Sequence, residues 1–231
     1  MLCHVEQHGV VTYQEGLDLQ RQRIAQRKAQ EIPDTLILLE HPHVLTLGRN
    51  ARRENLLVSP DWLQKAGVQL FETDRGGDIT YHGPGQLVGY PIFDLTGHRR
   101  DIAWYMRSVE EVLIRLAGDY GIEATRTQGA TGAWVGNEKL AAMGVHVSRW
   151  VTSHGFALNV NTDLHYFGWI VPCGITDKGV TSLEKLLGHK VQMEEVRERV
   201  IEHFGAVFGL EMEGSVTFRE SVTHRKAPMS C

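Results

Sequence analysis

The sequence predicts an α+β fold of the mixed α/β kind, on three observations. The chain has 231 residues, enough for one large domain with a substantial core. Hydrophobic residues make up 42% of it and charged residues 23%, as in ordinary globular proteins. Strand-like runs and a few long helices follow one another without the strict alternation of a doubly wound nucleotide-binding fold. We therefore expect a single domain over residues 1–231, with a C-terminal tail that frays from about residue 223.

The first part of the chain contains one long helix and several short strands. Residues 11–31 are polar, with Tyr13, Leu17 and Ile24 at helical spacing, which predicts a surface helix that Pro33 ends. Apolar runs then predict strands, and a short polar run predicts one or two helical turns. The strands are expected at 35–39, 43–47 and 68–71, and the turns at 61–66.

The clearest helix is predicted over residues 101–121, because its apolar residues share one face and Gly121 can cap its C-terminus. That face holds Ile102, Tyr105, Met106, Val109, Val112, Leu113 and Leu116. Strands rich in β-branched and small residues are expected at 132–135, 140–147 and 151–160. A last helix is expected over 191–208, on a stripe of Val196, Val200, Phe204 and Val207.

Charge and cysteine content exclude several classes of protein. The formal net charge is −4, which disfavours a non-specific nucleic-acid binder. Cys3, Cys173 and Cys231 are too few and too scattered for a disulfide framework. The first residues lack the basic and apolar regions of a signal peptide, and no apolar run is long enough to cross a bilayer. We expect a cytoplasmic protein that acts away from membranes.

Residues 75–91 form a glycine-rich segment, Arg-Gly-Gly-Asp-Ile-Thr-Tyr-His-Gly-Pro-Gly-Gln-Leu-Val-Gly-Tyr-Pro. Glycine costs backbone entropy and is favoured where φ must be positive or where another molecule approaches the backbone. The donors and acceptors of Arg75, Asp78, Tyr81, His82 and Gln86 lie among these glycines, which favours a ligand-binding loop. A β-hairpin with glycine turns is an equally good interpretation. The spacing fits neither a dinucleotide fingerprint nor a Walker A loop.

Two single residues are candidates for chemistry. Lys139 directly precedes small apolar residues, where burial could lower its pKa and make it a general acid or base. A solvent-facing lysine at a hairpin end is the commoner alternative. Cys173 lies between proline and glycine in a tight turn that could expose its sulfur and free backbone N–H groups for an oxyanion. Here the alternative is a buried structural cysteine.

The twelve histidines do not form a metal-binding pattern. Neither His-Glu-x-x-His nor Cys-x-x-Cys spacing occurs, so no metal site is expected. His82 is distinguished by its position inside the glycine-rich segment. The other histidines are expected to be surface or core residues.

Four blocks, in order, make the sequence resemble the lipoyl(octanoyl) transferase family. The first is the glycine-rich segment itself. The others are Gly-Asn-Glu-Lys-Leu-Ala-Ala-Met-Gly-Val at 136–145, His-Gly-Phe-Ala-Leu-Asn-Val at 154–160, and Pro-Cys-Gly at 172–174 followed by Gly-Val-Thr-Ser-Leu at 179–183. The resemblance covers roughly residues 35–190. It implies the catalytic fold shared with biotin protein ligases and lipoate-protein ligases, a mixed sheet flanked by helices.

The resemblance also implies an activity and a site. The activity is transfer of an octanoyl group from acyl carrier protein to a lysine of a lipoyl domain, in 2-oxo acid dehydrogenase E2 subunits and glycine cleavage H protein. Cys173 matches the catalytic cysteine and Lys139 its partner. Further residues match the acyl-binding stretches, namely Arg75, Gly76, Gly77, Asp78, Ile79, Thr80, Tyr81, His82, Ala142, Met143, Gly144, Gly155, Phe156 and Ala157.

The implied reaction requires no cofactor. Amide formation from a thioester runs downhill, and a thiolate can relay the acyl group through a thioester of similar energy. Two alternatives remain: an ATP-dependent lipoate-protein ligase, and a non-catalytic module that binds acyl groups or carrier proteins. Acyl carrier proteins are acidic, so a local basic surface is expected. Its candidate residues are Arg49, Arg52, Arg53 and Arg149.

Overall fold

A main sheet and a smaller sheet organise the computed structural model, which describes residues 1–171 and 178–216. In this part of the chain the main sheet has nine strands, in the order β12-β1-β2-β6-β10-β9-β8-β7, with β11 paired to β9. Its strands are β1 Leu2–Val10, β2 Asp34–Glu40, β6 Gln86–Ile92, β7 Thr125–Thr127, β8 Ala130–Val135, β9 Glu138–Ser148, β10 Val151–Asn159, β11 Gly179–Val180 and β12 Glu211–Val216. Parallel and antiparallel pairs both occur, so the sheet is mixed, as predicted.

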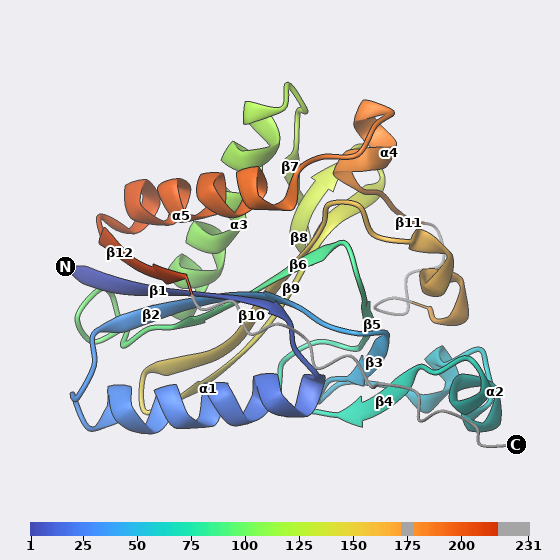
Figure 1. Cartoon of the computed structure of the whole chain (residues 1–231), viewed down its shortest axis with the longest axis horizontal. Coiled ribbons are helices and arrows are strands. Elements are labelled where there is room, and N and C mark those ends of the chain that lie inside the picture. The colour runs from blue at the N-terminus through green and yellow to red at the C-terminus, as the bar shows by residue number, and fades with distance from the viewer. Residues whose placement is uncertain (172–177, 217–231) are drawn as a thin grey trace, which may run out of the picture.

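The smaller sheet has the order β4-β3-β5 and lies at one end of the main sheet (Figure 1). Its strands are β3 Val44–Leu47, β4 Gln69–Glu72 and β5 Ile79–His82. A short helix, α2 Pro60–Lys65, and a 3-10 turn, η1 Arg53–Asn55, lie in the connection between β3 and β4. Leu45, Ile79 and Tyr81 belong to its hydrophobic cluster, with Phe167 from the 3-10 helix η2 Leu164–Trp169.

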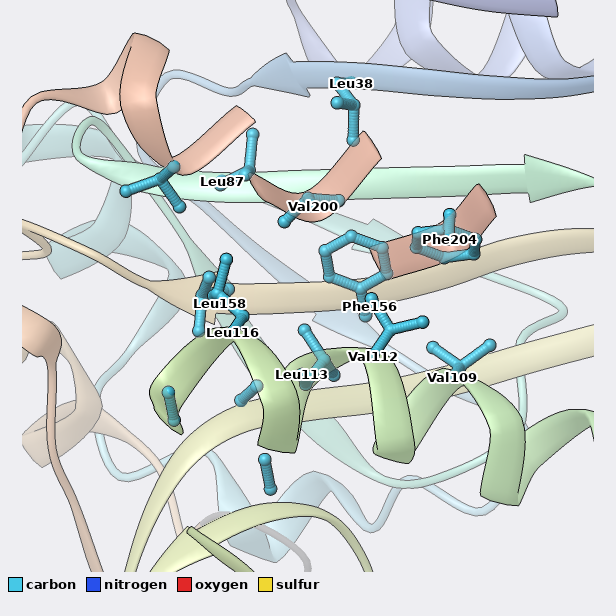
Figure 2. Packing of buried hydrophobic residues seen from close by; sticks show 14 of the residues in the cluster. Leu38, Leu87, Val109, Val112, Leu113, Leu116, Phe156, Leu158, Val200 and Phe204 are labelled. Carbon is cyan, nitrogen blue, oxygen red and sulfur yellow. The ribbon is translucent and has the colours of Figure 1, made fainter. Parts of the chain in front are cut away.

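Helices cover both faces of the main sheet (Figure 1). On one face α3 Ile102–Asp119 packs with α5 Met193–Phe208, and the short α4 Leu183–Leu187 lies beside them. Figure 2 shows how α3 and α5 meet strand β10 in this core. The residues shown there include Val109, Val112, Leu113, Leu116, Phe156, Leu158, Val200 and Phe204.

The opposite face carries α1 Tyr13–Lys28, which contacts β6 and β10. The helix begins where Thr12 and Glu15 form a capping box, which satisfies two backbone N–H groups of the first turn. It buries Tyr13, Gly16 and Gln20, a narrow stripe on an otherwise polar helix. Helix α1 therefore confirms the surface helix expected within residues 11–31.

The prediction of strands and helices was right for the apolar segments and incomplete elsewhere. The long helices α3 and α5 and strands β2, β3, β4, β8, β9 and β10 overlap the predicted ranges. Strands β1, β7, β11 and β12, helix α4 and turn η2 were not anticipated. Within the predicted face of α3, Ile102 is 46% exposed because it begins the helix, outside the core.

The hairpin interpretation of the glycine-rich segment is wrong. Strands β5 and β6 follow each other in the chain but belong to different sheets, since β5 pairs with β3 while β6 pairs with β2 and β10. Gly85 makes the corner between them with φ +80°, and a Cβ there would lie 2.4 Å from the carbonyl oxygen of Asn161. The segment thus joins the two sheets.

Two predictions fall outside the described residues. Cys173 lies in 172–177, and the tail expected to fray from about 223 lies in 217–231. Among the described helices, none combines the length and apolarity needed to cross a bilayer.

Candidate active site

A cavity opens where the glycine-rich segment meets strands β9 and β10. Its empty volume is about 690 Å³, part of it open to solvent. Val88, Tyr90 and Ala157 of its wall belong to the core on the α1 side of the main sheet. Apolar surface dominates the wall, which suits a hydrocarbon chain better than a polar ligand.

Most of the predicted binding residues line this cavity. The structure brings together Arg75, Gly77, Asp78, Ile79, Thr80, His82, Ala142, Met143, Gly144, Gly155, Phe156 and Ala157, together with Lys139. These residues come from β5, β9, β10 and the loop before β5. Val180, from the fourth block, also lines the cavity, so all four sequence blocks reach one hollow.

Two predicted residues do not line the cavity. Tyr81 faces the small sheet's own core, where its ring stacks on Tyr166 at 4.9 Å and its hydroxyl bonds to His43 Nδ1 at 2.8 Å. Side chains alternate along β5: Thr80 and His82 line the cavity, whereas Tyr81 lies on the other face with Ile79. Ile79 reaches the cavity wall as well, because it begins the strand at the loop. Gly76 contributes backbone: its N–H donates to the carbonyl of Val145 at 2.9 Å.

Glycines let the backbones around the cavity approach closely. A Cβ on Gly144 would lie 2.7 Å from the carbonyl oxygen of Gly76, and one on Gly155 would lie 2.1 Å from that of Gly89. A Cβ on Gly89 would come within 2.2 Å of the Phe156 ring. A larger residue at Gly144 would push the loop off β9, one at Gly155 would push β6 off β10, and one at Gly89 would displace the ring of Phe156.

Arg75 and Asp78 hold the loop in place. The Arg75 guanidinium is buried and donates from Nη2 to the carbonyl oxygen and hydroxyl of Thr46 at 2.7 and 2.8 Å, so it ties the loop to β3. Asp78 accepts from the N–H of Ile79 and from the side-chain amide of Asn55. The Asn55 carbonyl in turn accepts from the N–H of Val171 at 2.8 Å. This chain of bonds links the loop to the residue just before the Pro-Cys-Gly block.

His82 is a buried, neutral histidine on the cavity wall. Burial lowers its pKa to about 3. Gln86 donates from Nε2 to the Tyr81 carbonyl and to Asn159 Oδ1, so its Oε1 accepts from His82 Nδ1 at 2.8 Å. This network assigns the proton of the ring to Nδ1 and leaves Nε2 as an acceptor.

Lys139 lies at the start of β9, where its Nζ is 4.8 Å from the centre of the Trp134 ring. The Nζ of Lys178 lies 4.7 Å from the same ring. Val180 pairs with Lys139 across β9 and β11 and also lines the cavity. Cys173 lies outside the described residues, so its distance to Lys139 is not given by the structure. Phe167 and Val180, which precede and follow residues 172–177 in the chain, both lie on the cavity wall.

Sequence reasoning missed several residues of the wall, namely Tyr13, Val88, Tyr90, His154, Phe167 and Val180. Val88 and Tyr90 lie within the glycine-rich segment, and His154 opens the third block. Their membership of these blocks was the available signal. Tyr13 and Phe167 lie far away in sequence and reach the wall through α1 and η2, which no local pattern reveals.

Comparisons with known proteins agree with this geometry. Residues 12–205 match the family described as "Lipoyl protein ligase A/B catalytic domain". The chain is 56% identical over 210 residues to an octanoyltransferase of Solibacter usitatus, covering 91% of this chain and 94% of that protein. It is 53% identical over 210 residues to an octanoyltransferase of Caldicellulosiruptor saccharolyticus, covering 90% and 88%.

Solved structures show the same fold at low sequence identity. A lipoate-protein ligase A bound with ATP superposes with a TM-score of 0.76 at 16% identity, covering 94% of this chain and 90% of that one. A biotin protein ligase from Aquifex aeolicus gives a TM-score of 0.52 at 11% identity, covering 90% and 70%. The expected fold is thereby confirmed. Because the family match and the identity to these relatives both extend over most of the chain, the chain belongs to the lipoyl protein ligase A/B catalytic-domain family and, within it, to the octanoyltransferases, a class of acyltransferase.

Proposed function

We propose that the chain transfers an octanoyl group from octanoyl-acyl carrier protein to a lysine of lipoyl domains, through a thioester on Cys173. The acceptors are the lipoyl domains of 2-oxo acid dehydrogenase E2 subunits and glycine cleavage H protein. The whole chain acts as one catalytic domain in the cytoplasm. The observation that carries the proposal is the apolar cavity along β9 and β10 with Lys139 on its wall.

The cavity suits a medium-length acyl tail. Each buried methylene contributes about 0.8 kcal/mol, so an octanoyl tail could contribute on the order of 5 kcal/mol without any polar recognition. Val88, Ala142 and Ala157 supply the apolar side-chain surface on this face of the sheet. The glycines of the first block expose backbone beside the acyl group, where N–H groups can stabilise a tetrahedral oxyanion.

Cys173 and Lys139 divide the chemistry. The Cys173 thiolate attacks the thioester carbonyl of the donor, and the carrier protein leaves as its thiol, so one thioester replaces another. The amine of the acceptor lysine then attacks the Cys173 thioester, which forms the amide and regenerates the thiol. Lys139 as a cation favours the thiolate, and as a neutral amine it takes the proton that the incoming amine must lose.

The proposal is tested with purified octanoyl-carrier protein and a lipoyl domain, with no nucleotide present. We expect the lipoyl domain to gain one octanoyl group, detected by mass spectrometry, at a rate that ATP does not change. Modification that requires ATP and a free acid, with release of pyrophosphate, would instead identify a ligase. Binding of the octanoyl group without any transfer would identify a non-catalytic module.

A further inference from the structure

Two hollows lie on either side of one histidine. The first is the candidate acyl cavity. The second is a cleft of about 980 Å³, also open to solvent, whose wall has polar residues such as Gln20 and Asp74 beside the apolar Leu17 and Ile24. Among the described residues, His154 is the one that lines both hollows.

The contacts of His154 match this position. Toward the cavity, its ring packs edge-on against Tyr90, with centroids 6.5 Å apart. Toward the cleft, its Nε2 lies 2.7 Å from Asp74 Oδ1, and its backbone N–H donates to Gln20 Oε1 at 2.7 Å. Asp74 also lies 3.5 Å from His146 Nδ1. The imidazole is therefore held from both sides, with 4% of the residue exposed.

The backbone of His154 has a positive φ inside a β-strand, where a non-glycine residue rarely adopts it. Its φ is +56°, although it lies inside strand β10. The other described non-glycine residues with positive φ follow helix α1 or form the β9–β10 turn; they are Gln30, Arg149 and Trp150. Strain of this kind persists only where surrounding contacts fix it, and it concentrates at functional sites. At His154 those contacts direct the ring between the two hollows.

The ring lies at the end of the cavity that is remote from Lys139. In the β9–β10 register, Val145 faces His154 and Gly144 faces Gly155. Lys139 precedes Gly144 by five positions, which at about 3.4 Å per residue is a distance of about 17 Å along the strand. An acyl group whose carbonyl lies near Lys139 would thus point its tail toward His154.

We propose that His154, clamped by Asp74, is the end wall of the acyl cavity and sets the longest acyl chain that the enzyme accepts. The proposal rests on the proposed octanoyl transfer. Without the imidazole, the cavity would continue into the cleft, where Leu17 and Ile24 offer apolar surface to a longer tail. Specificity would then be set by closure of the cavity, because a hydrocarbon tail offers no polar group to recognise.

The test is His154→Gly. Glycine adopts φ +56° without strain, so this change removes the wall and leaves the backbone as it is. We expect the ratio of kcat/KM for dodecanoyl- over octanoyl-carrier protein to rise at least about tenfold, since each methylene that finds room strengthens binding about fourfold. Asp74→Asn, which weakens the clamp and keeps the ring, should raise the ratio less. Gln30→Gly is the matched control, with φ +60° at an exposed site, and should leave the ratio unchanged.

Calorimetric binding of octanoate and dodecanoate to the same variants gives a second measurement that needs no turnover. A wild-type protein that transfers no acyl group would refute the proposed function, and the calorimetric ratio would still test the wall. If folded His154→Gly has the same ratio of dodecanoate to octanoate affinity as the wild type, His154 is not the end wall of the cavity, whatever the activity of the variant. An active His154→Gly variant that keeps the chain-length preference of the wild type would contradict the proposal as well.

Discussion

At the scale of single residues, Lys139 and Lys178 offer a direct comparison. Both ammonium groups lie less than 5 Å from the centre of the Trp134 ring, but only Lys139 lines the cavity. A structural role through the indole would make both lysines matter alike, whereas acid–base chemistry would single out Lys139. The prediction from the sequence that Lys139 is catalytic is thus open to a test with an internal control.

Lys139→Ala is expected to slow octanoyl transfer by more than about 100-fold, within the range for loss of an acid–base group. Lys178→Ala is expected to retain most of the activity. Steady-state rates at several pH values provide the measurement, with circular dichroism to show that both variants fold. Equal losses for the two variants would assign Lys139 to structure.

Two buried histidines predict how stability depends on pH. Burial lowers the pKa of His41 to about 4 and that of His82 to about 3, while an unfolded histidine titrates near 6.5. Between these values the unfolded chain binds protons that the folded chain does not. The contribution of these histidines to the free energy of unfolding is therefore complete above about pH 6.5. It falls as the pH drops toward 4, by about 1.4 kcal/mol per pH unit for each histidine.

His41→Gln isolates one of these contributions, because His41 bonds to the Val11 carbonyl and the Tyr90 hydroxyl and does not line the cavity. Urea unfolding between pH 7 and 4.5 should show a shallower dependence in this variant than in the wild type. The slope is decisive here, since the substitution also changes the absolute stability. Identical slopes would contradict the assignment of His41 as a buried neutral ring.

Among the helices and strands, local sequence patterns predict those whose own apolar residues specify them. Helices α3 and α5 and strands β2 and β10 carry strong apolar periodicity or uniform apolarity and were found. Strand β1 was missed because polar residues occupy much of it; it buries Cys3, Val5 and Gln7 in alternation, and Gln7 is not recognised as a core residue. What makes β1 a strand is its pairing with β2 on one side and β12 on the other, and no local sequence pattern encodes that pairing.

The corner between β5 and β6 was misread for a related reason. Glycine turns between two strand-like runs fit a hairpin, and nothing local distinguishes a hairpin from a change of sheet. The carbonyl of Gly85 accepts from Asn161 and Thr162, which are remote in sequence. Those contacts fix the corner, and thereby place Thr80 and His82 on the cavity wall.

The corner makes a prediction about Gly85→Ala, with Gly67→Ala as its control. Both glycines have positive φ, +80° and +69°, but a Cβ meets the Asn161 carbonyl at Gly85 and nothing within 4 Å at Gly67. Gly67→Ala should lower the free energy of unfolding by about 1 kcal/mol through backbone strain. Gly85→Ala should cost at least about 2 kcal/mol more through the clash. Urea unfolding at pH 7 measures both, and equal losses would refute the close approach.

For the molecule as a whole, the arrangement of charge bears on the proposed donor, octanoyl-acyl carrier protein. A net charge of −4 gives no overall attraction to an acidic carrier protein, so docking requires a local basic surface. Arg52 and Arg53 are exposed and lie in the connection between β3 and β4. These two strands belong to the small sheet, at one end of the main sheet (Figure 1). Arg149 lies in the β9–β10 turn, near Lys28 at the C-terminal end of α1. The candidate arginines therefore occupy different ends and cannot all serve one docking surface.

Reversal of charge at Arg52 and Arg53 to Glu is expected to raise the KM for octanoyl-carrier protein severalfold, with little change in kcat. The double variant Lys28→Glu/Arg149→Glu makes the same change of four charge units at the other end and should leave the KM unchanged. Initial rates at low and moderate salt are the measurement, because screening should shrink the difference. A KM that responds equally to both changes would point to net charge and remove the proposed docking site.

The order of strands in the main sheet shows the limit of the sequence at this scale. Its apolar runs predict a mixed sheet, but not that β6 lies between β2 and β10. That neighbourhood brings the glycine-rich segment beside β9 and β10, and so assembles the cavity from distant blocks. The ordered blocks predicted which residues would meet, and the fold alone explains how they meet.

Capture of the acylated protein tests whether the octanoyl group passes through a thioester on Cys173. The chain is mixed with octanoyl-carrier protein without an acceptor, quenched in acid, and analysed by intact mass and peptide mass spectrometry. We expect one added octanoyl group, located on Cys173, released by a lipoyl domain and absent from Cys173→Ala, which transfers nothing. Full-rate transfer by a folded Cys173→Ala variant, or an octanoyl group found on another residue, would contradict it.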